Sequence, residues 1–253
     1  MIAARDLAPA QLDSVLGRTS PVLKLAISIA WLLGLATTVA PGPPLLIALT
    51  AVGAGSILGR VPGRDFARAL APLWLAAVGL ATFNTLFGAA NGDPNVAAIA
   101  QLGPFRITQA ALAAGIGLGL RVAAIGAVGA VFALTTDSTR LVDSLVQQGR
   151  LPERFAYGAL AAYGAVPRFG EDLATLRQAR RIRGLRGDWR PRLLVGLLVL
   201  AIRHGDRLAI AMDARAFGSG PRSRYREIRW SRLDLGVGLA AVVVLALALG
   251  LRA

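Results

Sequence analysis

The chain has 253 residues, of which 55% are hydrophobic, and its mean hydropathy is +0.58. That composition is too apolar for an ordinary soluble domain, and several segments are long enough to cross a bilayer. The absence of cysteine from the sequence excludes disulfides, thiolate metal sites and cysteine nucleophiles. The formal net charge is +14, and most of the basic residues lie between Asp137 and Arg232, so a basic block is set inside an apolar protein.

Five apolar segments follow a polar N-terminal stretch. The first 20 residues carry charged side chains and lack an apolar core, so no cleavable signal peptide is expected, and residues 1–22 are interpreted as a cytoplasmic N-terminal segment. The apolar segments are about Leu23–Ala40, Leu45–Leu58, Ala67–Leu86, Ala110–Leu134 and Leu235–Leu251. A helix needs roughly 20 residues to cross the hydrocarbon core. We therefore predict an all-α, polytopic membrane protein with about five transmembrane helices, four in residues 23–134 and one in 233–253, plus cytoplasmic helices in residues 135–232.

The placement of arginine between the segments predicts their orientation. The loop between the second and third segments carries Arg60, Arg64 and Arg68, whereas the longer loop 88–109 carries Arg106 as its only basic residue. Loops rich in arginine stay in the cytoplasm. We therefore expect a cytoplasmic N-terminus, a cytoplasmic helical block after the fourth segment, and a C-terminus outside.

Two features inside the fourth segment admit both a functional and a structural interpretation. Arg121 is a charge within a membrane span, which marks either a transport pathway or a pairing; we favour snorkelling or pairing, with Asp137 or a helix carbonyl as the partner. The run "GIGLGL", Gly115–Leu120, matches part of a dinucleotide-binding pattern, but no strand precedes it. Its glycines are better interpreted as small residues that let two helices approach closely.

Three helices are predicted for the cytoplasmic block. Asp137 or Ser138 is expected to cap the first helix, which ends at Gly149 and Pro152. The second runs from about 153 to 183 with an interruption at Pro167, and Gly184 and Gly187 stop it. The third runs from about 191 to 216, and Gly218, Gly220 and Pro221 stop it. Its apolar run Leu193–Ile202 is about half a span long, so we expect it to be buried against the membrane face or other helices rather than to cross.

The ends of the second and third helices repeat each other at a constant offset of 32 residues: Leu176, Ala179 and Arg183 recur as Leu208, Ala211 and Arg215. Seven residues are close to two helical turns, so each arginine lies nearly in line with the apolar stripe of its leucine. One interpretation is a cationic tip that inserts into a partner protein. The alternative is an arginine that interacts with the dipole at a helix C-terminus.

These parts, in their order and spacing, resemble the transmembrane coupling (T) components of energy-coupling factor transporters. The resemblance rests on Thr135-Thr136 after a membrane span, a Leu151-Pro152 step, and two Ala-Arg-Gly-like motifs, here Ile182-Arg183-Gly184 and Ala214-Arg215-Ala216. This chain departs from the family pattern at Ile182, where the family has alanine, and at Ala216, where it has glycine. Arginine is kept in both motifs.

The resemblance implies a subunit of a prokaryotic plasma-membrane importer that works with other chains. Two ABC ATPase subunits would each bind one motif in a groove, and a small substrate-binding membrane protein, the S component, would carry a vitamin or a metal ion. Biotin, thiamine or its precursors, cobalt and nickel all remain open as the substrate. The chain itself would be no enzyme and hold no cofactor or metal, since Lys24 lies in no phosphate-binding loop and His204 is the only histidine.

Three alternatives are weaker. An intramembrane enzyme needs an acid pair or a nucleophile with a base inside the spans, and no acid lies within the predicted spans. A substrate-binding membrane subunit or an ordinary permease would place polar ligand groups in the spans, whereas here the polar residues are concentrated in the cytoplasmic helices. The basic stretch Ser219–Trp230 has a nucleic-acid interpretation, but it directly precedes a span, so binding to the anionic surface of the lipid bilayer is favoured and no nucleic-acid partner is expected.

Overall fold

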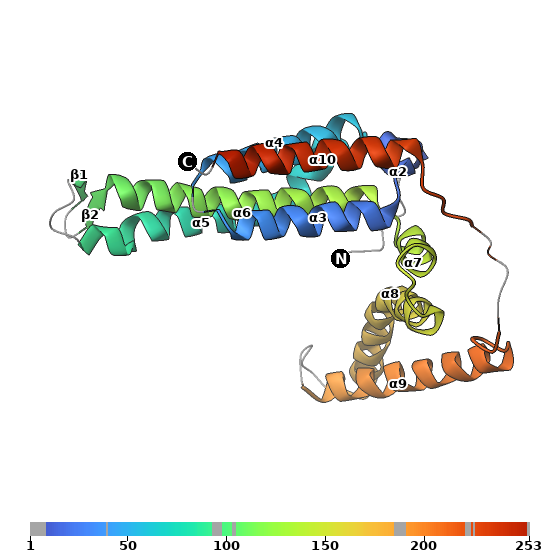
Figure 1. Cartoon of the computed structure of the whole chain (residues 1–253). Helices are drawn as coiled ribbons and strands as arrows, with labels where there is room; N and C mark the ends of the chain where they lie inside the picture. Colours follow the sequence, from blue (N-terminus) through green and yellow to red (C-terminus); the bar gives the residue numbers. More distant parts are fainter. Residues whose placement is uncertain are drawn as a thin grey trace. The chain divides into compact units, whose positions relative to one another are not determined.

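The computed structural model describes residues 9–38, 40–92, 98–102, 105–184, 191–220, 224 and 226–251. These residues divide into two compact units, a larger one formed by the described parts of 7–137 and 229–253, and a smaller one formed by those of 138–228. The larger unit holds the apolar helices and a short hairpin, and the smaller unit holds helices α7, α8 and α9 (Figure 1).

The larger unit confirms the all-α class. Its helices are α1 (Pro9–Leu12), α2 (Val15–Arg18), α3 (Pro21–Ala36), α4 (Gly42–Ile57), α5 (Gly63–Phe87), α6 (Gln109–Thr135) and α10 (Arg232–Gly250). Of these, α5, α6 and α10 are long and apolar enough to cross a membrane. Helices α3 and α4 are equally apolar but have only 16 residues each, or about 24 Å at 1.5 Å per residue. For these two helices, crossing stays a prediction.

Two helices begin before the apolar segments that were predicted for them. Helix α5 begins at Gly63 and α10 at Arg232, so each first turn includes an acid, Asp65 and Asp234. In α10 the early start has a local cause. The Ser231 Oγ accepts a hydrogen bond from the Leu233 N–H at 3.0 Å, and Asp234 accepts one from the Ser231 N–H. This reciprocal cap makes Ser231 the N-cap of α10, so the helix begins at Arg232.

The segment between α5 and α6, expected to be a loop, contains regular structure. A 3-10 turn (Ala89–Gly92) is followed by strands β1 (Ala98–Leu102) and β2 (Phe105–Thr108), which pair antiparallel. The Asn91 Oδ1 accepts hydrogen bonds from the Thr108 N–H at 3.0 Å and from its hydroxyl at 3.1 Å. The same hydroxyl oxygen accepts from the Ala111 N–H and caps α6.

Helix α6 is the centre of the larger unit. It packs along α5 and also contacts α4 and α3, and Figure 1 shows α5 and α6 side by side. A Cβ on Gly119 would lie 2.9 Å from the Ala77 carbonyl oxygen and 2.8 Å from the Ala81 Cβ. A Cβ on Gly115 would lie 2.7 Å from the Ala81 carbonyl oxygen. The interpretation of "GIGLGL" as a close-packing face is therefore confirmed.

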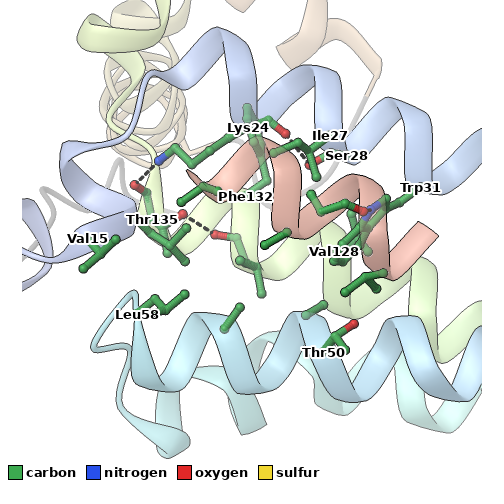
Figure 2. Close-up of a pocket in the computed structure, with 18 of the residues that line it drawn as sticks. Val15, Lys24, Ile27, Ser28, Trp31, Thr50, Leu58, Val128, Phe132 and Thr135 are labelled. Carbon is green, nitrogen blue, oxygen red and sulfur yellow. Dashed lines mark hydrogen bonds between the residues drawn. The ribbon is translucent and has the colours of Figure 1, made fainter. Parts of the chain in front are cut away.

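The apolar core of the larger unit is formed by α3, α4, α6 and α10, through the buried residues Trp31, Leu35, Ile47, Ala51, Ala124, Ala127, Val128, Ala241 and Ala248. The same four helices, with α2, line a cavity of about 440 Å³. Its walls are almost entirely apolar, and Lys24 and Thr135 contribute polar atoms to its lining (Figure 2).

The smaller unit consists of α7 (Ser138–Gln147), α8 (Glu153–Ile182) and α9 (Pro191–Ala214). The three helices occur where they were expected, except that the predicted interruption at Pro167 was wrong. Helix α8 is continuous through that residue. A proline inside a helix displaces the hydrogen bond to the carbonyl four residues earlier, here Tyr163. Both residues are exposed.

The apolar run of α9 has two different sides. Leu193 is buried, whereas Leu194, Val195 and Leu198 are exposed within this chain. Helix α9 is not among the described helices that are long and apolar enough to cross a membrane, and its position beside the membrane stays a prediction. Gly187 and Pro221, which were predicted to stop α8 and α9, lie outside the described residues.

Candidate functional site

The first arginine motif forms the C-terminal end of α8. The last helical residue is Ile182, and Arg183 is the C-cap, with its N–H directed at the Ala179 carbonyl oxygen at 3.4 Å. Gly184 follows with φ +71°, and its N–H donates to the Arg181 carbonyl oxygen at 3.0 Å. Helices commonly end with such a left-handed residue, and glycine adopts it without steric cost. The Ile182 side chain is 87% exposed and the Arg183 side chain is also exposed.

The second motif ends α9 with the same backbone pattern. Arg215 follows the last helical residue, Ala214, and Ala216 has φ +54°. The Ala216 N–H donates to Asp213 at 2.8 Å, and the Phe217 N–H donates to Met212 at 3.0 Å. These two bonds define a Schellman motif, which pairs the last carbonyls of the helix. The sequence repeat is therefore also a conformational repeat, with each arginine immediately before a left-handed residue.

Ala216 carries a steric cost that Gly184 does not. In the left-handed region the Cβ of an L-residue approaches the following carbonyl, which costs roughly 1–2 kcal/mol. Glycine removes this cost, but its greater entropy in the unfolded chain offsets part of the gain. We therefore expect Ala216→Gly to raise the free energy of unfolding of the smaller unit by about 0.5–1 kcal/mol. Thermal unfolding followed by circular dichroism in detergent measures this change.

A second alanine provides the matched control for this substitution. Ala179 is exposed and lies inside α8, so Ala179→Gly is expected to lower stability by about 1 kcal/mol through helix propensity alone. If both glycine variants lowered the unfolding temperature, the strain assigned to Ala216 would be absent.

Contacts with α7 and α8 position the turn that carries Arg215. The Phe217 ring packs edge-on against Tyr157, with centroids 6.5 Å apart, and Arg154 donates to the Gly218 carbonyl oxygen at 2.9 Å. The Tyr157 hydroxyl donates to Asp143 of α7 at 2.8 Å. Burial, the hydrogen bond to Asp143 and the nearby negative charge raise the pKa of Tyr157 to about 12, so this hydroxyl stays protonated at physiological pH.

The two motifs lie at opposite ends of an antiparallel helix pair. Leu176 of α8 lies beside Gly196 of α9, Arg168 lies 3.3 Å from His204, and Tyr157 contacts Phe217 beyond the end of α9. As the residue number falls along α8, it rises along α9. The stretch of α8 from Tyr157 to its C-terminal end has a rise of roughly 40 Å at 1.5 Å per residue. The motifs are therefore widely separated.

The other residues that the sequence analysis singled out lie outside the two motifs. Ala179 and Ala211 of the repeat are exposed, whereas Leu176 and Leu208 are half-buried between α8 and α9. The Nε atom of Arg121 is buried in α6 and has no hydrogen-bond partner among the residues that the structure describes. His204 meets the Arg168 guanidinium, and the described part of the chain contains no group of three or more acidic or histidine side chains placed to hold a metal ion.

Sequence reasoning missed the residues that fix the second motif and the buried polar residues of the larger unit. Asp143, Arg154 and Tyr157 carry no signal in their spacing, because their partners lie in other helices. Asp234 did have a local signal, since Ser231 followed three residues later by an acid is the pattern of a reciprocal helix cap.

Comparisons with known proteins agree with this architecture. The family model described as cobalt transport protein, CbiQ, matches residues 13–226. The energy-coupling factor transporter transmembrane protein EcfT of Heliobacterium modesticaldum is 30% identical over 242 residues, which cover 88% of this chain and 86% of that protein. EcfT of Bacillus subtilis is 28% identical over 172 residues, covering 61% of this chain and 65% of that protein.

The chain is also similar to a protein that is described as ATP-binding rather than as a transmembrane protein. A putative ABC transporter ATP-binding protein of Bifidobacterium longum is 26% identical over 178 residues, which are 64% of this chain and 22% of that protein. Together with the helical membrane architecture, these matches define a transmembrane protein of the energy-coupling factor class. The chain belongs to the CbiQ family and is a T component of these transporters.

Proposed function

We propose that this chain couples ATP hydrolysis by two separate ABC ATPase subunits to the uptake of a vitamin or metal ion through a separate substrate-binding membrane protein. The observation that carries the proposal is the conformational repeat: Arg183 and Arg215 occupy the same position before a left-handed residue, at two distant helix ends. Two motifs with the same local conformation are suited to bind two similar partner subunits. The similarity to a protein described as ATP-binding supports partners of that class.

The docking sites are Ile182, Arg183, Gly184, Ala214, Arg215 and Ala216. In each motif the helix ends at the residue before the arginine, so the guanidinium extends from a cap rather than from a helix face. Such a side chain enters a groove with little obstruction from its own helix. A guanidinium offers a planar set of donors to carboxylates and carbonyls, and arginines that become desolvated in a partner pocket dominate interface energies.

Force is passed along the helix pair in this proposal. When ATP closes the ATPase dimer, the two grooves move and carry the ends of α8 and α9 with them. The contacts of Arg154 and Tyr157 with the turn after Arg215 make that turn follow α8. The movement reorients the substrate-binding membrane protein. Chemistry is left to the partner ATPases, and Arg121 serves as a structural charge within α6.

The proposal places the protein in a prokaryotic plasma membrane with residues 1–22 and 135–232 in the cytoplasm. Residues 23–134 and 233–253 form its membrane part, and the C-terminus lies outside. Arginines between α4 and α5 support this orientation through the preference of basic loops for the cytoplasm. The exposed apolar side of α9 is then available to the bilayer or to the substrate-binding subunit.

Single cysteines test this placement without background labelling, since the sequence has none. Ile182 is 87% exposed in the first motif, and Ile99 of β1 is 59% exposed in the segment expected outside. We expect a membrane-impermeant maleimide to label Ile182→Cys in inside-out vesicles only, and Ile99→Cys in right-side-out vesicles only.

Addition of the partner ATPases extends this test to docking. Labelling of Ile182→Cys should then be blocked, while Tyr163→Cys, in the middle of α8, stays reactive. Labelling of Ile182→Cys from outside the cell would remove the basis for docking to cytoplasmic ATPases.

A further inference from the structure

Within the residues that the structure describes, the chain passes between its two units at two points. It leaves the larger unit after Asp137 and returns after Ile228. A displacement of helices α7, α8 and α9 that is passed along the described backbone enters the larger unit through these two crossings. The structure shows what holds each crossing on the side of the larger unit.

The first crossing is held by Lys24. Thr135 is the last residue of α6 and is 2% exposed, and its carbonyl oxygen accepts a hydrogen bond from the Lys24 Nζ at 2.7 Å (Figure 2). The last carbonyls of a helix have no partner within the helix, and a cation is favourable at that end of its dipole. Lys24 is the only lysine of the chain and is 7% exposed. Its ammonium group thus fixes the backbone two residues before the chain leaves this unit.

The second crossing is held by Asp234. This carboxylate is 3% exposed, and its two oxygens accept from two different backbone segments. Oδ2 accepts from the Ser231 N–H at 2.7 Å, at the point where the returning chain enters α10. Oδ1 accepts from the Ser20 N–H at 2.7 Å, next to the start of α3. One carboxylate therefore ties the returning backbone to α3.

Both ties end on one helical turn. Ser20 precedes α3 and Lys24 lies in its first turn, and the Lys24 N–H donates to the Ser20 carbonyl oxygen at 3.2 Å. Burial of a charge is unfavourable unless hydrogen bonds hold it, and apolar side chains would pack such a site at lower cost. A buried cation within this turn and a buried anion that binds its backbone indicate a requirement for fixed geometry.

We propose that the first turn of α3 is a common anchor for both crossings, and that Lys24 and Asp234 are positioning residues for energy coupling. This inference rests on the proposed function. The anchor makes displacement of the smaller unit act on α3, α6 and α10 together. Without it, the backbone at each crossing would change conformation locally, and the movement of the ATPases would not be transmitted to the membrane helices.

Two substitutions cut the ties separately. Lys24→Met keeps most of the side-chain stem and removes the ammonium, and the adjoining cavity leaves room for it. Asp234→Asn keeps the shape, but its amide nitrogen must face one of the two N–H donors that the carboxylate now accepts. Lys24→Arg restores a cationic donor and serves as the rescue variant.

Trp31→Phe is the matched control. The Trp31 indole N–H donates to the Ala241 carbonyl oxygen at 3.1 Å, so it also links α3 to α10 by one buried hydrogen bond. That bond lies far along α3 from Ser20 and Lys24, and it touches neither crossing. Loss of this hydrogen bond therefore measures the effect of weakening the contact between α3 and α10 in general.

The readout is an environment-sensitive fluorophore on a single cysteine at Leu247, which is 58% exposed near the far end of α10. In the complex with the partner ATPases, ATP with vanadate is expected to change its emission. We expect Lys24→Met and Asp234→Asn to reduce that change by about tenfold, the effect of one charge-assisted hydrogen bond, while the ATPases still bind and hydrolyse ATP. Lys24→Arg should recover most of the change, and Trp31→Phe should keep it.

The outcomes separate the two proposals. If the unaltered chain binds no ATPase, the proposed function fails. If the complex forms and hydrolyses ATP, but the emission change is absent in the unaltered chain or undiminished in both anchor variants, the anchor is wrong. An equal loss in Trp31→Phe also overturns it, because any weakened link between α3 and α10 would then act alike. Asp234→Asn is isosteric and keeps one of its bonds, so it supplies a folded variant should Lys24→Met not assemble.

Discussion

Replacement of Arg183 and Arg215 together by glutamate is expected to abolish co-purification of the ATPase subunits, with membrane insertion intact. Each arginine follows the last residue of its helix, so neither substitution disturbs a helix interior. An arginine that is desolvated in a partner groove contributes on the order of 2–4 kcal/mol to docking, and its reversal to glutamate adds repulsion from the same groove. Each single variant should weaken the complex, and the double variant should remove both points of attachment.

Co-expression with an affinity-tagged ATPase, followed by quantification of both chains, measures this effect. Arg203→Glu with Arg207→Glu is the control, since both residues are exposed in the middle of α9 and the change in charge is the same. The control should retain the ATPases. Full recovery of the complex with the Arg183 and Arg215 double variant would show that the motifs do not dock, and equal losses in both pairs would reduce the effect to net charge.

The second large effect is expected at the packed face of α6. Gly119→Val places side-chain atoms where a Cβ already lies 2.9 Å from the Ala77 carbonyl oxygen and 2.8 Å from the Ala81 Cβ. The obstructing atoms are backbone and a short side chain of α5, so no rotamer change relieves the overlap. The helices must separate, and we expect a loss of about 3 kcal/mol in the stability of the larger unit.

Gly129 supplies the control on the same helix. A Cβ at this position meets nothing within 4 Å, so Gly129→Val should leave stability nearly unchanged. Thermal aggregation of the detergent-solubilised protein, followed by size-exclusion chromatography, compares the two variants. If Gly119→Val and Gly129→Val unfolded at the same temperature, α6 would not depend on close contact with α5.

The helical plan was predictable because it depends on local composition. In lipid, a long apolar run can satisfy its backbone hydrogen bonds within itself only as a helix. In the smaller unit, a glycine or proline follows each helix close to its observed end. Pro167 shows the limit of such rules. A proline lowers helix stability by an amount that neighbouring residues outweigh, and α8 continues through it. The β1–β2 hairpin was missed because its pairing and the Asn91 contacts join residues apart in sequence.

The candidate site was predictable only as a pattern. The offset between the two arginines is visible in the sequence, and so is the glycine after Arg183. That Ala216 adopts the same left-handed conformation as Gly184 was not predictable, because alanine does not favour it. The turn is held by Met212, Asp213 and the contact of Phe217 with Tyr157.

The sequence by itself determined the class of protein, the helices and the two arginine motifs, since hydropathy, helix stops and spacing are properties of neighbouring residues. Only the tertiary structure decided how the pieces act on each other. It set the motifs at opposite ends of the α8–α9 pair, and it brought Lys24 and Ser20 to the points where the described backbone passes between its units. The reason is physical: a buried ammonium or carboxylate is bound by whichever backbone groups folding places beside it, and those groups lie more than a hundred residues away along the chain.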